Sequence, residues 1–481
     1  MTQKQSGWAD RAAGVLLATA AGDALGAGYE FTHPAPSTEI AMIGGGPFGF
    51  EPGEWTDDTS MAIAVARVTA AGVDLRTAAG LDAVSAGFSD WYSSRPKDIG
   101  NQTRAVLSAR DKSGAAMQAT ARGLAGRKGG NGSLMRTAAV GIAYLDDDQA
   151  CIEAAEQISA LTHDDERAQQ ACQLWSYAIR HAVLYGNFDG VRKFLDLAGG
   201  EVAQFWAPLL DLAESGTPQD FPNNGWVVHA LQTAWWAITH ADQSDATHLQ
   251  KALELAVRAG HDTDTTAAIA GGLLGARWGA SAVPAAWRRI LHGWPGLRAK
   301  NLIALAVLTA AGGHADPQGW PSIDRIDYSR WQTGHAAVPH PHDPGVLMGG
   351  YDSAFTGATD AVISLCRMGS ADLGVEHVEF WLKDSGPQDN PNLEFVLNDA
   401  ARTIRDLRSE GKTVLLHCVE GRSRTPSVAA RYSILLGREP RDVRKTMAWC
   451  KPDPQLWQVA TAFGSSYSSG VVHAWPAVRW R

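Results

Sequence analysis

The chain has 481 residues, of which 45% are hydrophobic and 19% are charged. This is the composition of a globular protein and excludes a disordered or collagen-like chain, and at about 150 residues per domain the length predicts two to four domains. With 42 basic and 51 acidic residues, the formal net charge is −9. Such an acidic chain is not suited to broad nucleic-acid binding, although it is compatible with a local basic pocket.

The number of cysteines and the length of the apolar runs indicate the cellular compartment of the protein. Five cysteines without a C-x-x-C pair argue against a disulfide framework and a zinc ribbon, which favours a reducing, cytoplasmic setting. Segment 12–21 is similar to a short signal-peptide core, but Asp10 and Asp23 flank it closely. No uncharged apolar run reaches about 18 residues, so we predict neither a membrane span nor a membrane partner.

Residues 1–312 predict an all-helical domain. Ala- and Leu-rich stretches such as 151–163, 169–186 and 249–260 carry apolar residues every three or four positions and end near glycine or a polar turn. The following segment, 313–344, is rich in Pro, Gly and His and has no periodicity, which predicts a linker. Its four histidines could alternatively bind a metal: His314, His335, His340 and His342.

Residues 345–481 predict an α/β domain with a mostly parallel central sheet. Segments 361–366 and 375–381 are β-rich, and 413–417 (TVLLH) is a predicted buried strand. An apolar face between Leu393 and Leu407 predicts a helix that stops at Gly411, and a second helix is predicted over 425–436. Alternation of strands and helices is typical of such a sheet.

The predicted strand 413–417 runs into a loop that begins with Cys418 and ends with Arg424. Backbone N–H groups of a loop with five intervening residues can surround a phosphate, and a helix N-terminus and an arginine stabilise a nearby thiolate. The thiolate is a strong nucleophile, and the arginine fork can bind two phosphoryl oxygens. Gly421 permits a loop conformation that a side chain would hinder. The alternative is a buried structural cysteine beside a surface arginine.

The segment HCVEGRSRT (417–425) matches the pattern HC-x-x-G-x-x-R-[ST], and residues 345–465 resemble the dual-specificity branch of the protein tyrosine phosphatases. The resemblance implies that Cys418 forms a phosphocysteine, that Arg424 binds the phosphoryl group and that Thr425 assists breakdown of the intermediate, with no cofactor. It also implies phosphate binding by the loop, which comprises Val419, Glu420, Gly421, Arg422, Ser423 and Arg424.

The same resemblance implies an aspartic acid that acts as general acid, on a loop about 30 residues before the cysteine. Asp384 lies 34 residues upstream of Cys418, where a predicted strand ends, and we choose it over Asp389. For either residue, an exposed carboxylate in a turn is the alternative.

Three polar clusters interrupt the predicted helices of the first domain: 22–26 (GDALG) with Glu30 after it, 55–59 (WTDDT) and 260–266 (GHDTDTT). Adjacent carboxylates such as Asp57 and Asp58 repel each other, so they are tolerated best at a helix N-terminus or around a cation. Hard oxygen ligands favour Mg²⁺, Mn²⁺ or Ca²⁺ over zinc. The alternative is that each cluster only caps a helix.

Together with KDIG (97–100) and GNGSLMR (130–136), these clusters make residues 8–312 resemble the ADP-ribosylglycohydrolase family, the enzymes similar to dinitrogenase-reductase-activating glycohydrolase. The resemblance implies two divalent metals, Mg²⁺ or Mn²⁺, held by Thr56, Asp57, Asp58, Asp262, Asp264 and Thr265. It places Asp98 near the scissile bond and Glu30 on a flap over the metals. It also implies ADP-ribose binding by Gly130, Asn131, Gly132, Ser133, Met135 and His163; a structural role is the alternative for that histidine.

The sequence therefore predicts a bifunctional cytoplasmic hydrolase. The first domain would cleave an ADP-ribosyl linkage in an ADP-ribosylated protein or an ADP-ribose derivative. The second would hydrolyse a phosphorylated protein or a small phosphate ester. Both sites could act on one modified protein, or in sequence on a phosphorylated ADP-ribose metabolite. The alternative from another class is that one domain is a non-catalytic reader of ADP-ribose or phosphate that targets the other.

Overall fold

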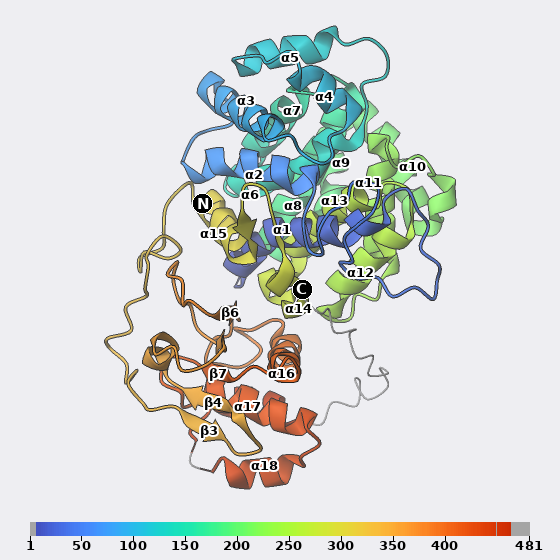
Figure 1. Cartoon of the computed structure of the whole chain (residues 1–481). Helices are drawn as coiled ribbons and strands as arrows, with labels where there is room; N and C mark the ends of the chain where they lie inside the picture. The colour runs from blue at the N-terminus through green and yellow to red at the C-terminus, as the bar shows by residue number, and fades with distance from the viewer. Residues whose placement is uncertain (1–5, 449, 463–481) are drawn as a thin grey trace.

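The computed structural model describes residues 6–448 and 450–462. Figure 1 shows a large helical domain and a smaller α/β domain, connected by an extended segment. The helices of the first domain are α1 (Trp8–Gly26), α2 (Asp57–Ala70), α3 (Ala78–Ser93), α4 (Asn101–Leu107), α5 (Gly114–Gly123), α6 (Ala138–Ala143), α7 (Asp148–Ala160), α8 (Glu166–Tyr185), α9 (Gly190–Ala198), α10 (Gly200–Ser215), α11 (Val227–His240), α12 (Thr247–Arg258), α13 (Thr263–Trp278), α14 (Ala285–Ile290) and α15 (Ala299–Ala310).

Helices α1 and α13 form the centre of this domain because both are apolar around most of their circumference. Glycines let their backbones touch: a Cβ on Gly22 would lie 2.2 Å from the Ala267 carbonyl oxygen, and one on Gly26 2.4 Å from the Asp264 nitrogen. This close packing brings the end of α1 against the start of α13. The prediction of a helical domain is confirmed. The domain also contains a short antiparallel hairpin of two two-residue strands, β1 (His292–Gly293) and β2 (Leu297–Arg298).

The second domain is built on a five-stranded sheet in the order β3-β4-β7-β5-β6. Strand β3 is antiparallel to β4, and the other three pairings are parallel. Gly349, His417 and Ser364 lie opposite one another at the carboxyl ends of β4, β7 and β5. The elements are β3 (Val338–His340), β4 (Asp343–Gly349), β5 (Ala361–Ser364), β6 (Glu376–Glu379), α16 (Leu393–Ser409), β7 (Val414–His417), α17 (Arg424–Leu435), α18 (Pro440–Thr446) and α19 (Pro454–Thr461).

The sheet begins inside the segment predicted as a linker, because β3 and the start of β4 lie before residue 345. His340 and His342 each bond to α17 rather than to a shared ion: His340 Nε2 lies 3.1 Å from the Ala429 oxygen, and His342 Nδ1 lies 3.0 Å from Ser433 Oγ. Among residues 6–448 and 450–462, both groups of ligand atoms close enough to hold a metal are in the helical domain. The histidine-metal alternative is therefore not supported. The predicted end of the second domain, 463–481, lies outside the described residues.

Polar contacts and apolar packing join the two domains. Arg289 pairs with Glu376 at 2.6 Å and with Glu410 at 2.8 Å. Helix α14 lies against α16 (Figure 1). Trp381 and Phe395 of the second domain pack against the core of the first. Within the described part of the chain, no helix is both long and apolar enough to cross a bilayer.

Candidate active site

Buried carboxylates from four segments meet where α1, α2 and α13 converge. One carboxylate oxygen from each of Asp23, Asp58 and Asp264 lies within 4.8 Å of the others, and the same holds for Glu30, Asp262 and Asp264. We call the set Asp23, Glu30, Asp57, Asp58, Asp98, Asp262 and Asp264 the acid cluster. The structure thus brings together the predicted carboxylates from segments more than 200 residues apart.

Hydroxyl groups hold these carboxylates. Thr56 occupies the N-cap position of α2, yet its hydroxyl donates at 2.9 Å to Asp58 Oδ2 instead of capping the helix. The Thr265 side chain is hydrogen-bonded to Asp262. Asp57 and Asp58 lie in the first turn of α2, where the helix dipole favours negative charge. Helix capping alone therefore does not account for the cluster around Thr56.

Asp23 is a site residue that the sequence interpretation missed. It lies in the last turns of α1 and is fully buried. Its Oδ1 accepts the Thr56 N–H at 2.9 Å, and its Oδ2 accepts the Thr59 N–H at 3.0 Å and the Thr59 hydroxyl at 2.6 Å. These bonds fix the first turn of α2 against α1. The available signal was the acidic residue within the apolar stretch GDALG.

The acid cluster is electrostatically strained without a cation. Burial, and then the charge of Asp262, raises the pKa of Glu30 to about 9. Burial, and then the charge of Asp98, raises the pKa of Asp57 to about 8. Burial also raises the pKa of Asp58 and Asp264 well above the ordinary value. Protons or bound cations must therefore offset the charge of this cluster at neutral pH.

The donor set fits a hard divalent cation. Three buried oxygens have no hydrogen-bond partner among the described residues: Glu30 Oε2, Asp58 Oδ1 and Asp264 Oδ1. An unpartnered buried carboxylate oxygen is costly unless it ligates an ion. Carboxylate and hydroxyl oxygens are the ligands that Mg²⁺, Mn²⁺ and Ca²⁺ prefer.

The glycine-rich loop lies beside the acid cluster. Asn131 Nδ2 donates at 2.6 Å to Asp262 Oδ2 and at 2.9 Å to the Asn224 oxygen, so it links the loop to the cluster. Asp98 is half-buried and accepts the Ile99 N–H at 2.7 Å. A groove of about 180 Å³ runs past Asp57 and Asp98 and is bordered by Trp55 and Lys97.

Three side chains predicted to contact ADP-ribose are buried beneath this loop instead. The hydroxyl of Ser133 bonds to Ser159 at 3.0 Å, and Met135 lies in the hydrophobic core. His163 is buried with its Nδ1 2.7 Å from the Thr162 hydroxyl, and a Cβ on Gly132 would lie 3.2 Å from its ring. These side chains therefore support the loop. The Asn131 N–H donates to the Gly225 oxygen at 3.2 Å, so the backbone of Gly130 and Gly132 is the part left for a ligand.

A second polar site lies at the carboxyl end of the central strand β7. Cys418 follows this strand directly, and α17 begins at Arg424, so the intervening loop turns at the edge of the sheet where ligands of α/β proteins bind. Gly421 has φ +76°, and a Cβ there would lie 2.8 Å from the Gly349 oxygen. Strand, cysteine loop and helix thus have the predicted arrangement.

Side chains around this cysteine loop include two with unsatisfied polar atoms. Arg424 donates one guanidinium N–H to the Leu365 oxygen at 2.7 Å and to the Leu382 oxygen at 3.1 Å. Its Nε and the Thr425 hydroxyl are buried and have no partner within the described segments. Ser423 Oγ donates to Asp384, which places Asp384 beside the loop. Asp389 makes no hydrogen bond to the cysteine loop among the described residues, and its N–H donates to the Gly386 oxygen at 3.2 Å.

Comparisons with known proteins give the class of the first domain. The family model for ADP-ribosylglycohydrolase matches residues 4–317. The chain is 32% identical over 290 residues to the ADP-ribosylarginine hydrolase Tri1 of Pseudomonas putida (strain GB-1), covering 58% of this chain and 73% of that protein. It is 29% identical over 288 residues to the ADP-ribosyl-[dinitrogen reductase] glycohydrolase of Rhodospirillum rubrum, covering 58% and 89%.

A solved structure titled ADP-ribosylglycohydrolase-related protein complex has a TM-score of 0.51 and 28% identity, covering 64% of this chain and 99% of that one. The chain belongs to the ADP-ribosylglycohydrolase family. The family match ends at residue 317, before the five-stranded sheet begins at Val338.

Proposed function

We propose that the helical domain hydrolyses an ADP-ribosyl linkage to a protein side chain, with arginine as the first linkage to test. The observation that carries this is the acid cluster, with its unpartnered oxygens on Glu30, Asp58 and Asp264, beside the glycine-rich loop. The arginine linkage is supported by relatives named ADP-ribosylarginine hydrolase.

The protein's own residues supply binding and orientation. Thr56, Asp57, Asp58, Asp262, Asp264 and Thr265 would hold two divalent metals, which when bound orient ribose hydroxyls and activate water. The backbone N–H groups of Gly130 and Gly132 would bind the diphosphate. Within the acid cluster, Asp98 and Glu30 would position the sugar and the attacking water. Asn131 keeps Asp262 in place.

Turnover of an ADP-ribosylarginine peptide tests this proposal. We expect Mg²⁺- or Mn²⁺-dependent release of ADP-ribose that stops on addition of chelator and is lost in Asp262→Asn with Asp264→Asn. The Cys418→Ser variant is the matched control and should retain this activity. Turnover that persists in the double aspartate variant would show that the acid cluster is not the site.

A second candidate function, phosphate-ester hydrolysis by the α/β domain, is favoured by the contact between Ser423 and Asp384 across the cysteine loop. The Cys418 thiolate would attack phosphorus, the P–O bond to the leaving group would break, and Asp384 would protonate the departing oxygen. Water would then cleave the phosphocysteine to give phosphate and regenerate the thiol, with Thr425 donating to the leaving sulfur. Arg424 would turn from the Leu365 and Leu382 carbonyls to bind the phosphoryl oxygens.

Aryl phosphate turnover that is insensitive to chelator and lost in Cys418→Ser would support this second function. Full activity of Cys418→Ser would contradict it. If only the helical domain turns over substrate, binding calorimetry with inorganic phosphate would test the remaining interpretation, in which the α/β domain is a phosphate reader. A product of one site that is consumed at the other would indicate sequential action on one molecule.

A further inference from the structure

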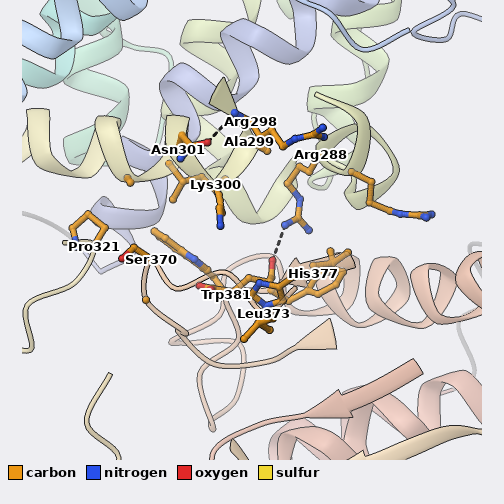
Figure 2. A pocket seen from close by; sticks show the side chains of 18 of the residues that line it. Arg288, Arg298, Ala299, Lys300, Asn301, Pro321, Ser370, Leu373, His377 and Trp381 are labelled. Carbon is orange, nitrogen blue, oxygen red and sulfur yellow. Dashed lines mark hydrogen bonds between the residues drawn. The ribbon is translucent and has the colours of Figure 1, made fainter. Parts of the chain in front are cut away.

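A cavity of about 490 Å³ lies between the two domains, apart from both sites described above. Its walls come from three parts of the chain: the start of α15 in the helical domain, Trp320 and Pro321 of the connecting segment, and β6 with Trp381 of the α/β domain (Figure 2). The volume is that of sites for small organic ligands, which occur preferentially at domain interfaces. None of the residues of the acid cluster or the cysteine loop lines it.

The walls of the cavity are held in place by direct contacts between the domains. Arg288 donates to the Glu379 oxygen at 2.7 Å, and Asp399 accepts the Ala285 N–H at 2.9 Å. On the far side, the Asn392 amide donates to the Trp278 oxygen at 2.6 Å. The cavity is therefore formed before any ligand arrives, which lowers the entropic cost of binding.

Two cationic groups of the cavity walls, Lys300 and Arg298, form no ion pair with a described residue. Arg288 and Arg289 are satisfied by acidic partners, Asp399 for the first and Glu376 with Glu410 for the second. Lys300 is exposed and makes no ion pair or hydrogen bond with any residue in the described ranges. Figure 2 shows its side chain extending from α15 toward His377 and Trp381 across the cavity.

The other charged groups of the walls have local partners. The Glu376 carboxylate is shared by Arg289 and Lys412, and Glu379 accepts the Met368 N–H at 3.2 Å. Asp372 accepts the Gly374 N–H at 3.0 Å. The cationic side chains of the cavity without an ion pair are therefore Lys300 and Arg298, and Lys300 is the one that extends toward His377 and Trp381 (Figure 2).

Aromatic rings form the opposite side. The indoles of Trp320 and Trp381 pack edge to face with centroids 5.3 Å apart, and both line the cavity. The Arg367 guanidinium lies 4.3 Å from the centroid of the Trp320 ring and keeps this pair in place. Trp320 is buried, whereas Trp381 is half-buried, so Trp381 is the ring of this pair on which another flat ring can stack.

We propose that this cavity binds a small aromatic anion of the nucleoside monophosphate class, with its planar ring against Trp381 and its anionic group on Lys300. The local basic pocket that the acidic composition left open is thus located at the domain interface. This binding does not depend on hydrolysis at either of the other sites.

Titration calorimetry of the full chain with AMP, in the presence of chelator, tests the proposal. We expect AMP binding that weakens at least tenfold in Lys300→Glu and also in Lys300→Gln, because each removes the Lys300 ammonium. Lys112→Glu, at an exposed lysine far from the cavity in sequence and in the fold, is the matched control and should bind AMP as the wild type does. Ribose 5-phosphate, which lacks the ring, should bind at least tenfold more weakly than AMP.

Three results would overturn the proposal. The first is no detectable heat from AMP at millimolar concentration. The second is an AMP affinity that is unchanged in both Lys300 variants, which would place the nucleotide at another site. The third is equal affinity for AMP and ribose 5-phosphate, which would exclude ring recognition by Trp381. Thermal unfolding of each variant checks that Lys300, which has no partner to lose, is replaced without loss of fold.

Discussion

The Asp23 carboxylate accepts the backbone N–H of Thr56 at 2.9 Å, so a residue of α1 fixes the first turn of α2. This turn carries Asp57 and Asp58. We predict that Asp23→Asn raises the Mg²⁺ concentration needed for half-maximal ADP-ribosyl hydrolysis at least tenfold, because an amide has one acceptor oxygen where the carboxylate has two.

Asp147→Asn is the matched control for this change, because Asp147 also accepts a backbone N–H, that of Ala150 at 2.9 Å, at the start of α7. It should lower stability slightly and leave the Mg²⁺ dependence as in the wild type. An unchanged Mg²⁺ activation curve in Asp23→Asn would show that Asp23 does not position the ligands.

The contact of Asp384 with Ser423 gives a prediction about the general acid. Asp384→Asn should lower kcat on phenyl phosphate by at least about a hundredfold, since general acids contribute about 10²- to 10⁴-fold. The loss should be smaller for an ester whose leaving group needs no proton. Asp389→Asn should behave as the wild type, and steady-state kinetics of the two variants on both esters would distinguish them. If Asp389→Asn lowered kcat on phenyl phosphate and Asp384→Asn did not, Asp389 would be the general acid.

Gly421 and Gly437 form a matched pair for testing the cysteine loop. Both have positive φ, +76° and +82°, but a Cβ on Gly421 would clash with the Gly349 backbone, whereas one on Gly437 would meet nothing within 4 Å. Each alanine variant should lose about 1 kcal/mol of stability from the backbone conformation. Only Gly421→Ala should in addition lose aryl phosphate turnover. Equal activity of both variants would show that loop geometry at Gly421 is not needed.

Asp399 makes the domain interface sensitive to pH. Burial raises its pKa from 3.8 to about 6, even though Arg288 opposes the shift. The unfolded carboxyl loses its proton near pH 3.8 while the folded one keeps it, so this contribution to stability is complete below about pH 4 and is lost as the pH rises through about 6. At about 1.4 kcal/mol per pKa unit, the loss is about 3 kcal/mol.

Chemical denaturation of the wild type and of Asp399→Asn between pH 4 and pH 7 would measure this effect. Asparagine keeps an acceptor for the Ala285 N–H and does not titrate. The difference in the free energy of unfolding between the two proteins should therefore change with pH in this range. Parallel curves would show that Asp399 is ionised in the folded protein throughout.

Local patterns predicted much of the fold. The helix predicted from the apolar face between Leu393 and Leu407 is α16, and the buried strand predicted at 413–417 contains β7. Their periodicity is strong because one face of the helix and all of the strand are buried. The β1–β2 hairpin was not predicted, because strands of two residues are too short to show an alternating pattern.

The candidate sites were predicted to the extent that their residues stand in dense motifs. Asp57, Asp58, Asp262 and Asp264 were visible as clusters, whereas Asp23 is a single acid in an apolar helix and acquires its partners through packing. The burial of Ser133 and His163 was not predicted, because a loop motif does not reveal which side chains turn inward. Lys300 and Trp381 are 81 positions apart, so the cavity they share could not be inferred from the sequence.

The packing of Trp381 and Phe395 against the helical core limits how the chain can be divided. A truncation placed after residue 317, where the family match ends, would expose the apolar surface that these two rings cover and would leave Arg289 without Glu376 and Glu410. Part of the apolar surface of the helical domain is thus covered by the α/β domain rather than by solvent. Exchanging either domain for that of a relative would require redesign of this shared boundary.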